Sequence, residues 1–265
     1  MTTQQLFFTH VMKTGGTSLS TTIRAQLPLS SVYPHAEGSS LAAKTFSDRL
    51  LGLDDDTRAR YRFITVHHPA WVAFAADPSA CKVTVLREPV ARTVSHLRQL
   101  AAARDVPDDM EQIYADSGWR DRLSNYQTQL FAGVDLPAQG PIATLDSGAE
   151  LAAGALDEDG LAALHRGLAQ VWNTAIMRPI EVDASHVDLA IATLERYDWV
   201  GVTEDLPRTL ERVSELTGLA LPHATHLNKS DAFPVPDALL QRIADDNRFD
   251  TRLHAAAREI SRRTP

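Results

Sequence analysis

Residues 6–18, LFFTHVMKTGGTS, decide how the N-terminal part of the chain folds. Leu6–His10 is a short apolar run with two phenylalanines, which is typical of a buried strand. Lys13–Ser18 is polar and contains two glycines, which is typical of a tight loop. Thr17–Leu27 then has the pattern of a helix, and the hydroxyl residues at its start can cap it. The stretch predicts a strand, a glycine loop and a helix N-terminus in direct succession.

Two more strands follow, with room for helices between them. Phe63–His67 is predicted as the second strand, and Lys82–Leu86, with the sequence KVTVL, as the third and clearest. Pro89 begins a helix that runs to about Arg104, because proline suits the first turn of a helix. Strands separated by helical crossovers favour a parallel sheet. We therefore predict an α/β fold: a three-layer, P-loop-like sandwich with a central parallel sheet and helices on both faces.

The remainder of the chain has a mainly helical pattern. Helices are expected at Leu41–Leu53, Asp205–Leu216 and Ala238–Arg263, the last in one or two pieces. The middle region, Val106–Ala175, is mostly helical in pattern, with a loop at Gly133–Gly148. Short strands are expected at Pro179–Val182 and Trp199–Val202. No internal repeat, low-complexity tract or clear linker divides the sequence, so we predict one domain over residues 1–265.

The composition excludes several classes of protein. The chain has 265 residues, 44% hydrophobic and 23% charged, as in a folded protein rather than a fibrous or disordered one. Its 26 basic and 34 acidic residues give a net charge of −8, which argues against nucleic acid as the main partner. The single cysteine, Cys81, cannot form an internal disulfide, so we expect a reducing compartment and a cytoplasmic protein. No apolar run approaches about 18 residues, so we expect no membrane span.

The loop Lys13–Ser18 has the features of a phosphate-binding loop. Backbone N–H groups at a helix N-terminus lack helical partners, and the helix dipole attracts an anion. Glycines let the backbone approach phosphate oxygens, Lys13 adds a positive charge, and Thr17 and Ser18 add hydroxyl donors. Unlike the Walker A loop, in which the lysine follows the glycines, Lys13 precedes them. The alternative is an ordinary strand-to-helix turn that needs glycine.

A second candidate site follows the third strand. Arg87 comes directly after Leu86, and in open α/β sheets ligands bind at the carboxyl ends of the strands. A guanidinium group suits bidentate recognition of phosphate. Ser95 lies eight residues further on and can point from the second turn of the following helix toward the same region. The alternative is that Arg87 pairs with an acidic neighbour and Ser95 is solvated.

Together the two motifs resemble those of sulfotransferases that use 3′-phosphoadenosine 5′-phosphosulfate (PAPS), above all the heparan sulfate 2-O-sulfotransferase branch and its bacterial relatives. In that branch a K-T-G-[GS]-T-S loop holds the 5′-phosphosulfate. A later strand ending in R-[DE]-P, with Ser eight residues after the Arg, holds the 3′-phosphate. This chain has Lys13–Ser18, then Arg87–Pro89 and Ser95, in that order. The resemblance implies a cofactor-binding set of Lys13, Thr14, Gly15, Gly16, Thr17, Ser18, Arg87 and Ser95.

The similarity continues more weakly along most of the chain. Three further segments resemble family segments: Ser124–Thr128, Gly201–Glu204 and His226–Lys229. Asn228 and Lys229 are thereby implied to close over the cofactor. The chain departs from the family at Met12, where proline commonly precedes the loop lysine, and at His254, where the terminal helix often carries tyrosine. His10 resembles a histidine that precedes the loop in relatives, and we expect it to fix the loop.

Transfer of a sulfuryl group to a hydroxyl needs a base for the acceptor proton, and histidine fits because its pKa of about 6.5 lies near working pH. In the resembling family the base is a histidine in the stretch before the R-[DE]-P strand. The family motif aligns best with His68, and His67 is the second candidate. Because successive strand residues face opposite ways, at most one of them should reach the acceptor.

The resemblance implies an enzyme that transfers a sulfuryl group from PAPS to a small-molecule, lipid or carbohydrate acceptor and releases adenosine 3′,5′-bisphosphate, with no metal. Its cofactor-binding core is expected mainly at residues 1–105 and 198–230, and its acceptor-side region at about 106–175. One alternative is a P-loop kinase or nucleoside triphosphatase, which would need a Walker A order and a Mg²⁺-binding aspartate. Another is a nucleotide-binding module without catalysis. Neither the acceptor nor the oligomeric state follows from the sequence.

Overall fold

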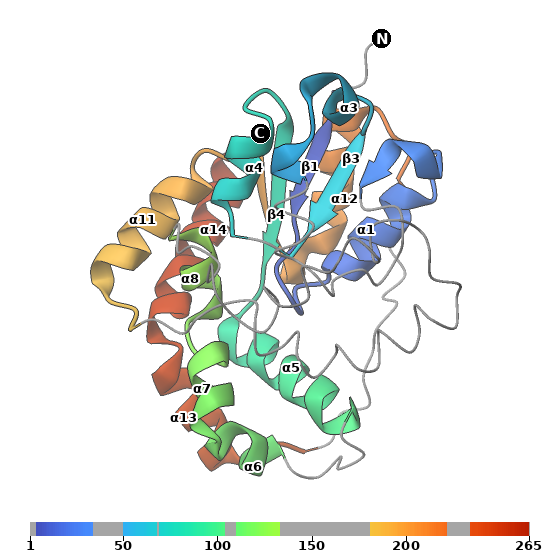
Figure 1. The fold of residues 1–265 in the computed structure, drawn as a ribbon. Coiled ribbons are helices and arrows are strands. Elements are labelled where there is room, and N and C mark those ends of the chain that lie inside the picture. Colours follow the sequence, from blue (N-terminus) through green and yellow to red (C-terminus); the bar gives the residue numbers. More distant parts are fainter. Residues whose placement is uncertain are drawn as a thin grey trace.

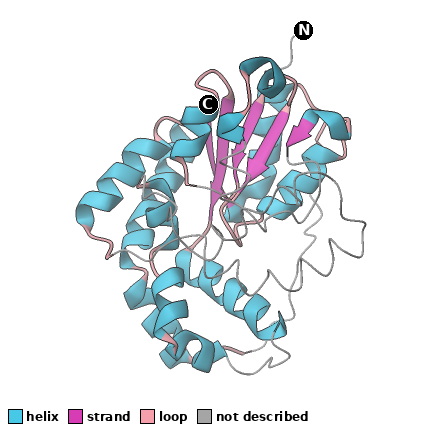
Figure 2. Ribbon diagram, in the orientation of Figure 1, coloured by secondary structure: helices cyan, strands magenta, loops and turns pink. Residues whose placement is uncertain are grey.

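A five-stranded parallel sheet lies at the centre of the computed structural model (Figures 1 and 2), which describes residues 4–33, 50–67, 69–103, 110–132, 181–221 and 234–264. The strands are β1 (Leu6–Thr9), β2 (Val32–Tyr33), β3 (Phe63–Val66), β4 (Cys81–Leu86) and β5 (Trp199–Val202). Their order across the sheet is β2-β3-β1-β4-β5, and every neighbouring pair is parallel. The carboxyl ends of β1, β4 and β5 therefore meet at one edge.

One face of the sheet is covered by α1 (Gly16–Arg24) and α12 (Leu206–Thr217). Side chains alternate between the two faces along a strand, and the residues of β1 that point to this face are Leu6 and Phe8. They pack with Leu19 and Ile23 of α1 and with Leu210 and Val213 of α12. α12 approaches β5 closely, since a Cβ atom on Gly201 would lie 2.2 Å from the hydroxyl of Thr209.

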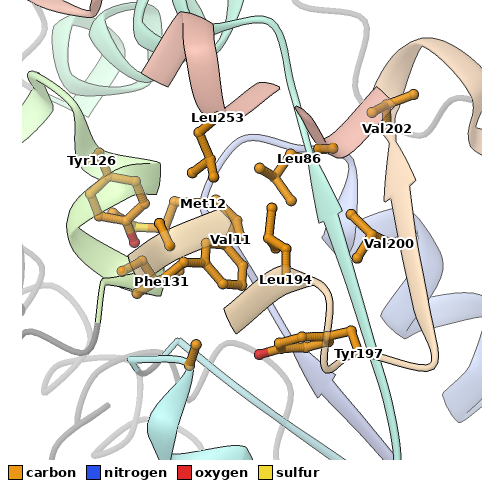
Figure 3. Close-up of a cluster of buried hydrophobic side chains, with 14 residues drawn as sticks. Val11, Met12, Leu86, Tyr126, Phe131, Leu194, Tyr197, Val200, Val202 and Leu253 are labelled. Atoms are coloured by element: carbon orange, nitrogen blue, oxygen red, sulfur yellow. The ribbon is translucent and has the colours of Figure 1, made fainter. Parts of the chain in front are cut away.

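The opposite face is covered by helices from distant parts of the chain. They are α4 (Trp71–Ala76), α8 (Tyr126–Phe131), α11 (Ala184–Leu194) and α14 (Arg248–Arg263). Figure 3 shows the cluster that joins three of them to the sheet: Tyr126 and Phe131 of α8, Leu194 of α11 and Leu253 of α14 meet Leu86, Val200 and Val202. With α1 and α12 behind the sheet, the molecule has three layers, so the predicted three-layer α/β fold is confirmed.

A further group of helices lies beyond the carboxyl edge of the sheet (Figure 1). It consists of α5 (Pro89–Ala103), α6 (Met110–Ala115), α7 (Ser117–Leu123) and α13 (Asp237–Asp246). Their apolar faces share a core of their own, which includes Leu97, Tyr114 and Ile243. α5 follows directly from β4, so this group is anchored at the edge where the loop of β1 also lies.

Most predicted elements are confirmed within a residue or two. Gly218, with a left-handed φ of 69°, follows the last residue of α12, and the expected C-terminal helix is divided at Asn247 into α13 and α14. β3 ends at Val66, one residue earlier than expected, and β2 and the short helices α3 (Asp55–Ala59) and α4 were not predicted. The part of the helical middle that is described, Met110–Phe131, is helical. The rest of that region, most of Leu41–Leu53 and half of Pro179–Val182 lie outside the described residues, and the described half of the latter, Glu181 and Val182, is not a strand.

None of the helices in the described ranges combines the length and apolar character that a bilayer crossing requires.

Candidate functional site

The two sequence motifs meet at the carboxyl edge of the sheet. The Nη1 atom of Arg87, which follows β4, donates a hydrogen bond of 3.1 Å to the carbonyl of Lys13, which follows β1. The hydroxyl of Thr203, which follows β5, lies 2.7 Å from the carbonyl of Thr14 and 3.1 Å from that of Leu86. Three strand ends are thus joined by hydrogen bonds, and the loop and the arginine belong to one site.

The loop has an uncommon backbone conformation. Lys13 has φ 68° and Gly15 has φ 81°, so two of its residues are left-handed, and only the second is a glycine. Left-handed non-glycine residues cost free energy and gather at functional sites. The N-terminus of α1 at Gly15 has no side-chain cap. Among the described residues no side chain accepts from the first N–H groups of this helix, as an anion-binding helix end requires.

The hydroxyl residues of the loop have different environments. Thr14 is fully buried and donates 2.9 Å to the carbonyl of Val11, so its hydroxyl holds the loop, and only its backbone is left to meet a ligand. Thr17 is exposed, whereas Ser18 is buried in the first turn of α1. Of the two predicted hydroxyl donors, Thr17 is therefore the accessible one.

His10 fixes the loop, as the sequence predicts. A Cβ atom on Gly16 would lie 2.2 Å from Cδ2 of His10, so the imidazole ring occupies the space that any larger residue at position 16 would need. The ring also stacks on Phe8, with centroids 5.3 Å apart. Burial, and next the neighbouring His67, hold the pKa of His10 well below its usual value, so this ring is neutral and packs as a spacer under the loop.

His67 lies directly beside the ring of His10. Its Nδ1 is 2.6 Å from the carbonyl of His10, and the two rings are 4.2 Å apart between centroids. A carbonyl oxygen only accepts, so Nδ1 carries the proton and the lone pair of the neutral ring is on Nε2. Burial lowers the pKa of His67 to about 4, partly opposed by the hydrogen bond to His10. The ring is thus oriented and unprotonated at neutral pH, as a general base must be.

Lys13 and Arg87 give the site its positive charge. Burial lowers the pKa of Lys13, and the charge of Arg87 lowers it further. Burial also lowers the pKa of Arg87, and the charges of Glu204 and Glu88 oppose that effect. Within the described part of the chain neither cation forms an ion pair. Two partly desolvated cations on neighbouring segments favour an anionic ligand.

The acidic neighbours of Arg87 are occupied elsewhere. The carboxylate of Glu88 accepts from the N–H groups of Val90 (3.0 Å) and Ala91 (2.7 Å) and so caps α5. Glu204 accepts from the N–H of Glu88 at 2.9 Å and lies 3.3 Å from Nε2 of His254. Burial raises the pKa of Glu204, but these hydrogen bonds outweigh it and lower the value to about 2. The alternative in which Arg87 simply pairs with an acidic neighbour is therefore not what the described residues show.

Of the remaining predicted site residues, the structure describes only Ser95. Ser95 is half-buried in the second turn of α5. His68, Asn228 and Lys229 lie outside the described residues, so their roles stay predictions. Ser95 is therefore placed on the helix that begins at the carboxyl end of β4, and the segment expected to close over the site lies outside the described residues.

Two residues of the site lie in segments that the sequence analysis noted as resembling the family, Gly201–Glu204 and Ser124–Thr128, but it gave neither residue a role. Thr203 joins the loop to β4, and the amide of Gln127 pairs with the backbone of Arg87 at 3.0 Å in both directions. Thr203 follows β5, so the rule that carboxyl ends of parallel strands meet at one edge would have placed it here. Gln127 is on a helix far along the chain, and the resemblance of Ser124–Thr128 to a family segment marks its neighbourhood without indicating its contact with Arg87.

No protein-family model and no curated protein matches the chain. Among solved structures, the chain is similar to a sulfotransferase from Alicyclobacillus acidocaldarius, with 14% sequence identity and a TM-score of 0.40 over 97% of this chain and 100% of that one. A likeness this distant supports no conclusion about activity, so the function proposed below rests on the geometry of the site and on the resemblance of its two sequence motifs.

The state of His67 can be tested directly. We expect nitrogen-15 NMR of the imidazole to show the Nδ1–H tautomer at pH 7 and a pKa near 4, because burial disfavours the charged ring. The His67→Asn variant assigns the signals, and His186, which is on α11 outside the site, serves as the internal comparison. An Nε2–H tautomer, or titration near pH 6.5, would contradict the geometry.

Proposed function

We propose that this protein is a sulfotransferase that transfers a sulfuryl group from PAPS to a hydroxyl or amine of an acceptor. The observation that carries the proposal is the hydrogen bond from Arg87 to the Lys13 carbonyl, which makes the loop and the arginine strand one site. The resemblance of both motifs to PAPS-dependent sulfotransferases supplies the chemistry. The donor would bring an activated sulfuryl group with adenosine 3′,5′-bisphosphate as leaving group.

The residues present fit a doubly phosphorylated nucleotide. The uncapped N-terminus of α1 and the Lys13 amine would hold the 5′-phosphosulfate, with Gly15 and Gly16 allowing close approach. Arg87 and Ser95 would hold the 3′-phosphate. Asn228 and Lys229 are proposed, on the resemblance alone, to cover the nucleotide. A metal ion is not part of the proposal, because Lys13 and the loop N–H groups can meet the charge of the leaving phosphate.

The chain's own residues would support one in-line displacement. The acceptor oxygen forms its bond to sulfur while the bond from sulfur to the phosphate oxygen breaks, and the electron pair leaves with the bisphosphate. Lys13 stabilises the charge that grows on that oxygen. We propose His67 as the base that takes the acceptor proton on Nε2, since the His10 carbonyl fixes its ring. His68 is the other candidate, named by the resemblance.

The acceptor class is proposed as a small molecule, a lipid or a carbohydrate, with specificity set by the region at about 106–175. A screen of cell extract with sulfur-35 PAPS, followed by identification of the labelled product, tests the activity and finds the acceptor together. Titration calorimetry with PAPS, ATP and adenosine 3′,5′-bisphosphate separates this function from a kinase or nucleoside triphosphatase. Binding without any labelled product would instead indicate a nucleotide-binding module.

The first prediction concerns Arg87. We expect the native protein to bind adenosine 3′,5′-bisphosphate about 10- to 100-fold more tightly than AMP, since a hydrogen bond to a charged group is worth about 1.5–3 kcal/mol. Arg87→Ala should remove most of this preference, as measured by calorimetry. Arg212→Ala, which removes an arginine on the surface of α12 outside the site, is the control. Equal affinity of the native protein for the two nucleotides would overturn the assignment of donor.

The second prediction concerns Lys13. Lys13→Gly removes the amine and still permits the φ of 68°, so it separates the charge from the backbone conformation. We expect turnover to fall about 10²–10³-fold, as when a transition-state donor is lost, and bisphosphate affinity to fall much less. Lys13→Ala adds backbone strain and is the comparison. Native turnover at saturation with weakened binding would mean that Lys13 only anchors the donor.

The third prediction separates the two histidines. We expect His67→Ala to lower turnover about 10²–10⁴-fold, the usual range for a general base, with donor affinity little changed. A base with a pKa of about 4 is protonated only below that pH, so native turnover should stay level from pH 7 toward 5 and fall near 4. A severe His68→Ala variant together with an acid limb near pH 6.5 would assign the base to His68. Near-native turnover of both variants would exclude both.

A further inference from the structure

The side-chain amide of Gln127 extends the sheet by one hydrogen-bonded pair. Leu86 and Val202 are the last residues paired between β4 and β5, so Arg87 lies just beyond the end of the ladder. There the Oε1 atom of Gln127 accepts from the N–H of Arg87 at 3.0 Å, and Nε2 donates to the carbonyl of Arg87 at 3.0 Å. Both polar groups of the Arg87 backbone are thus satisfied by one side chain, as a neighbouring strand would satisfy them.

Gln127 is itself held by a carboxylate on α14. Asp250 accepts from the N–H of Gln127 at 3.0 Å with one oxygen, and from the N–H and hydroxyl of Thr128 at 2.7 and 2.8 Å with the other. These N–H groups belong to the first turn of α8, whose own N-cap residue, Asn125, makes no side-chain cap. Asp250 therefore caps the N-terminus of α8 from another helix. This cap fixes the position of Gln127 in the first turn of α8.

The capping is reciprocal. Oδ1 of Asn125 accepts from the N–H groups of Phe249 at 3.0 Å and Asp250 at 3.2 Å, which belong to the first turn of α14. The N–H of Asn125, whose φ is 49°, donates to Oδ1 of Asn247 at 2.9 Å. Each helix thus supplies the cap of the other, and neither can rotate or slide without breaking both caps.

A buried arginine acts electrostatically on this junction. Asp250 and Arg92 are both fully buried. Burial raises the pKa of Asp250 above its usual value, and the charge of Arg92 and the hydrogen bonds from Thr128 and Gln127 oppose this only in part. The guanidinium of Arg92 lies 4.8 Å from the ring centroid of Tyr126 and donates to the carbonyl of Leu123 at 2.7 Å. Buried polar networks of this kind cost free energy but specify one arrangement.

We propose that Gln127 is a positioning residue for Arg87, and that the Asn125–Asp250 junction holds it in place for that purpose. The proposal rests on the proposed function in one respect, namely that the anion bound at Arg87 is the 3′-phosphate of the donor. Gln127 is fully buried, so it acts on the ligand only through the backbone of Arg87. The guanidinium reaches both the Lys13 carbonyl and a ligand only if the strand end that carries it is fixed.

The chain offers a matched control in the same helix. Gln129 is as buried as Gln127, with 1% exposure against 0%, and its Nε2 donates to the carbonyl of Ser124 at 2.9 Å instead of to Arg87. Gln127→Met and Gln129→Met each remove one buried amide of similar size from α8. If the preference for adenosine 3′,5′-bisphosphate over AMP falls only because α8 is weakened, it should fall equally in both variants.

The test begins with the native protein. We expect hydrogen exchange to show the Arg87 amide protected although it lies beyond the last strand pair, and rapid exchange there would overturn the proposal before any variant is made. Gln127→Met should then reduce the preference for adenosine 3′,5′-bisphosphate over AMP about 5- to 10-fold, the worth of roughly one hydrogen bond. AMP affinity should be unchanged, and Gln129→Met should keep the native preference.

A double variant checks that the effect passes through Arg87. In the Arg87→Ala background, Gln127→Met should have no further effect on the preference, because the group it positions is gone. An additive loss, or an equal loss in Gln129→Met, would overturn the proposal. If the native protein shows no preference for the bisphosphate, the donor assignment fails, and inorganic phosphate becomes the probe. The affinity of the protein for inorganic phosphate must then fall in Gln127→Met, as in Arg87→Ala, and stay native in Gln129→Met. Any other result would overturn the positioning role as well.

Discussion

The hydroxyl of Thr203 lies between two carbonyls, that of Thr14 in the loop after β1 and that of Leu86 at the end of β4. Parallel strands bring their carboxyl ends to one edge, but adjacent ends are still separate loops that can move independently. This single side chain, on the segment after β5, ties the two functional segments to each other. The hydrogen bond from Arg87 to Lys13 closes the same junction from the other side. These two contacts add to the pairing of β1 with β4 and to the hydrogen bonds from Gln127 in placing the loop and the arginine next to each other.

The cost of this arrangement is electrostatic. Burial removes solvation from Lys13 and Arg87 and lowers the pKa of both side chains. The charge of Arg87 lowers the pKa of Lys13 further. Lys13 also holds a left-handed backbone conformation that its side chain disfavours. An anion bound between them would relieve the charge repulsion, and ligand binding stabilises the folded state that binds it.

Local sequence patterns predicted those parts of the fold that are determined by residues close together in the sequence. The apolar runs of β1, β3 and β4, the glycine loop and the glycine at the end of α12 could all be predicted, because each is set by residues close in sequence. β2 has only two residues, Val32 and Tyr33, and offers no periodicity to recognise. Gln127 could not be predicted, since its role comes from a partner 40 residues away and from a cap supplied by α14. His67 could be nominated by type, but only the His10 carbonyl shows its tautomer.

The R-E-P stretch illustrates how one short sequence serves three separate needs. Pro89 begins α5, and Glu88 before it caps the first turn with its own carboxylate. That carboxylate is therefore occupied by N–H groups although it is next to Arg87 in sequence. The other nearby carboxylate, Glu204, accepts from the Glu88 backbone and contacts His254. Both carboxylates thus hold the strand end and the helix start, and among the described residues neither forms an ion pair with Arg87. In this chain the acidic residue between Arg87 and Pro89 is therefore taken up by the helix that it precedes, which leaves the arginine to bond the Lys13 carbonyl instead.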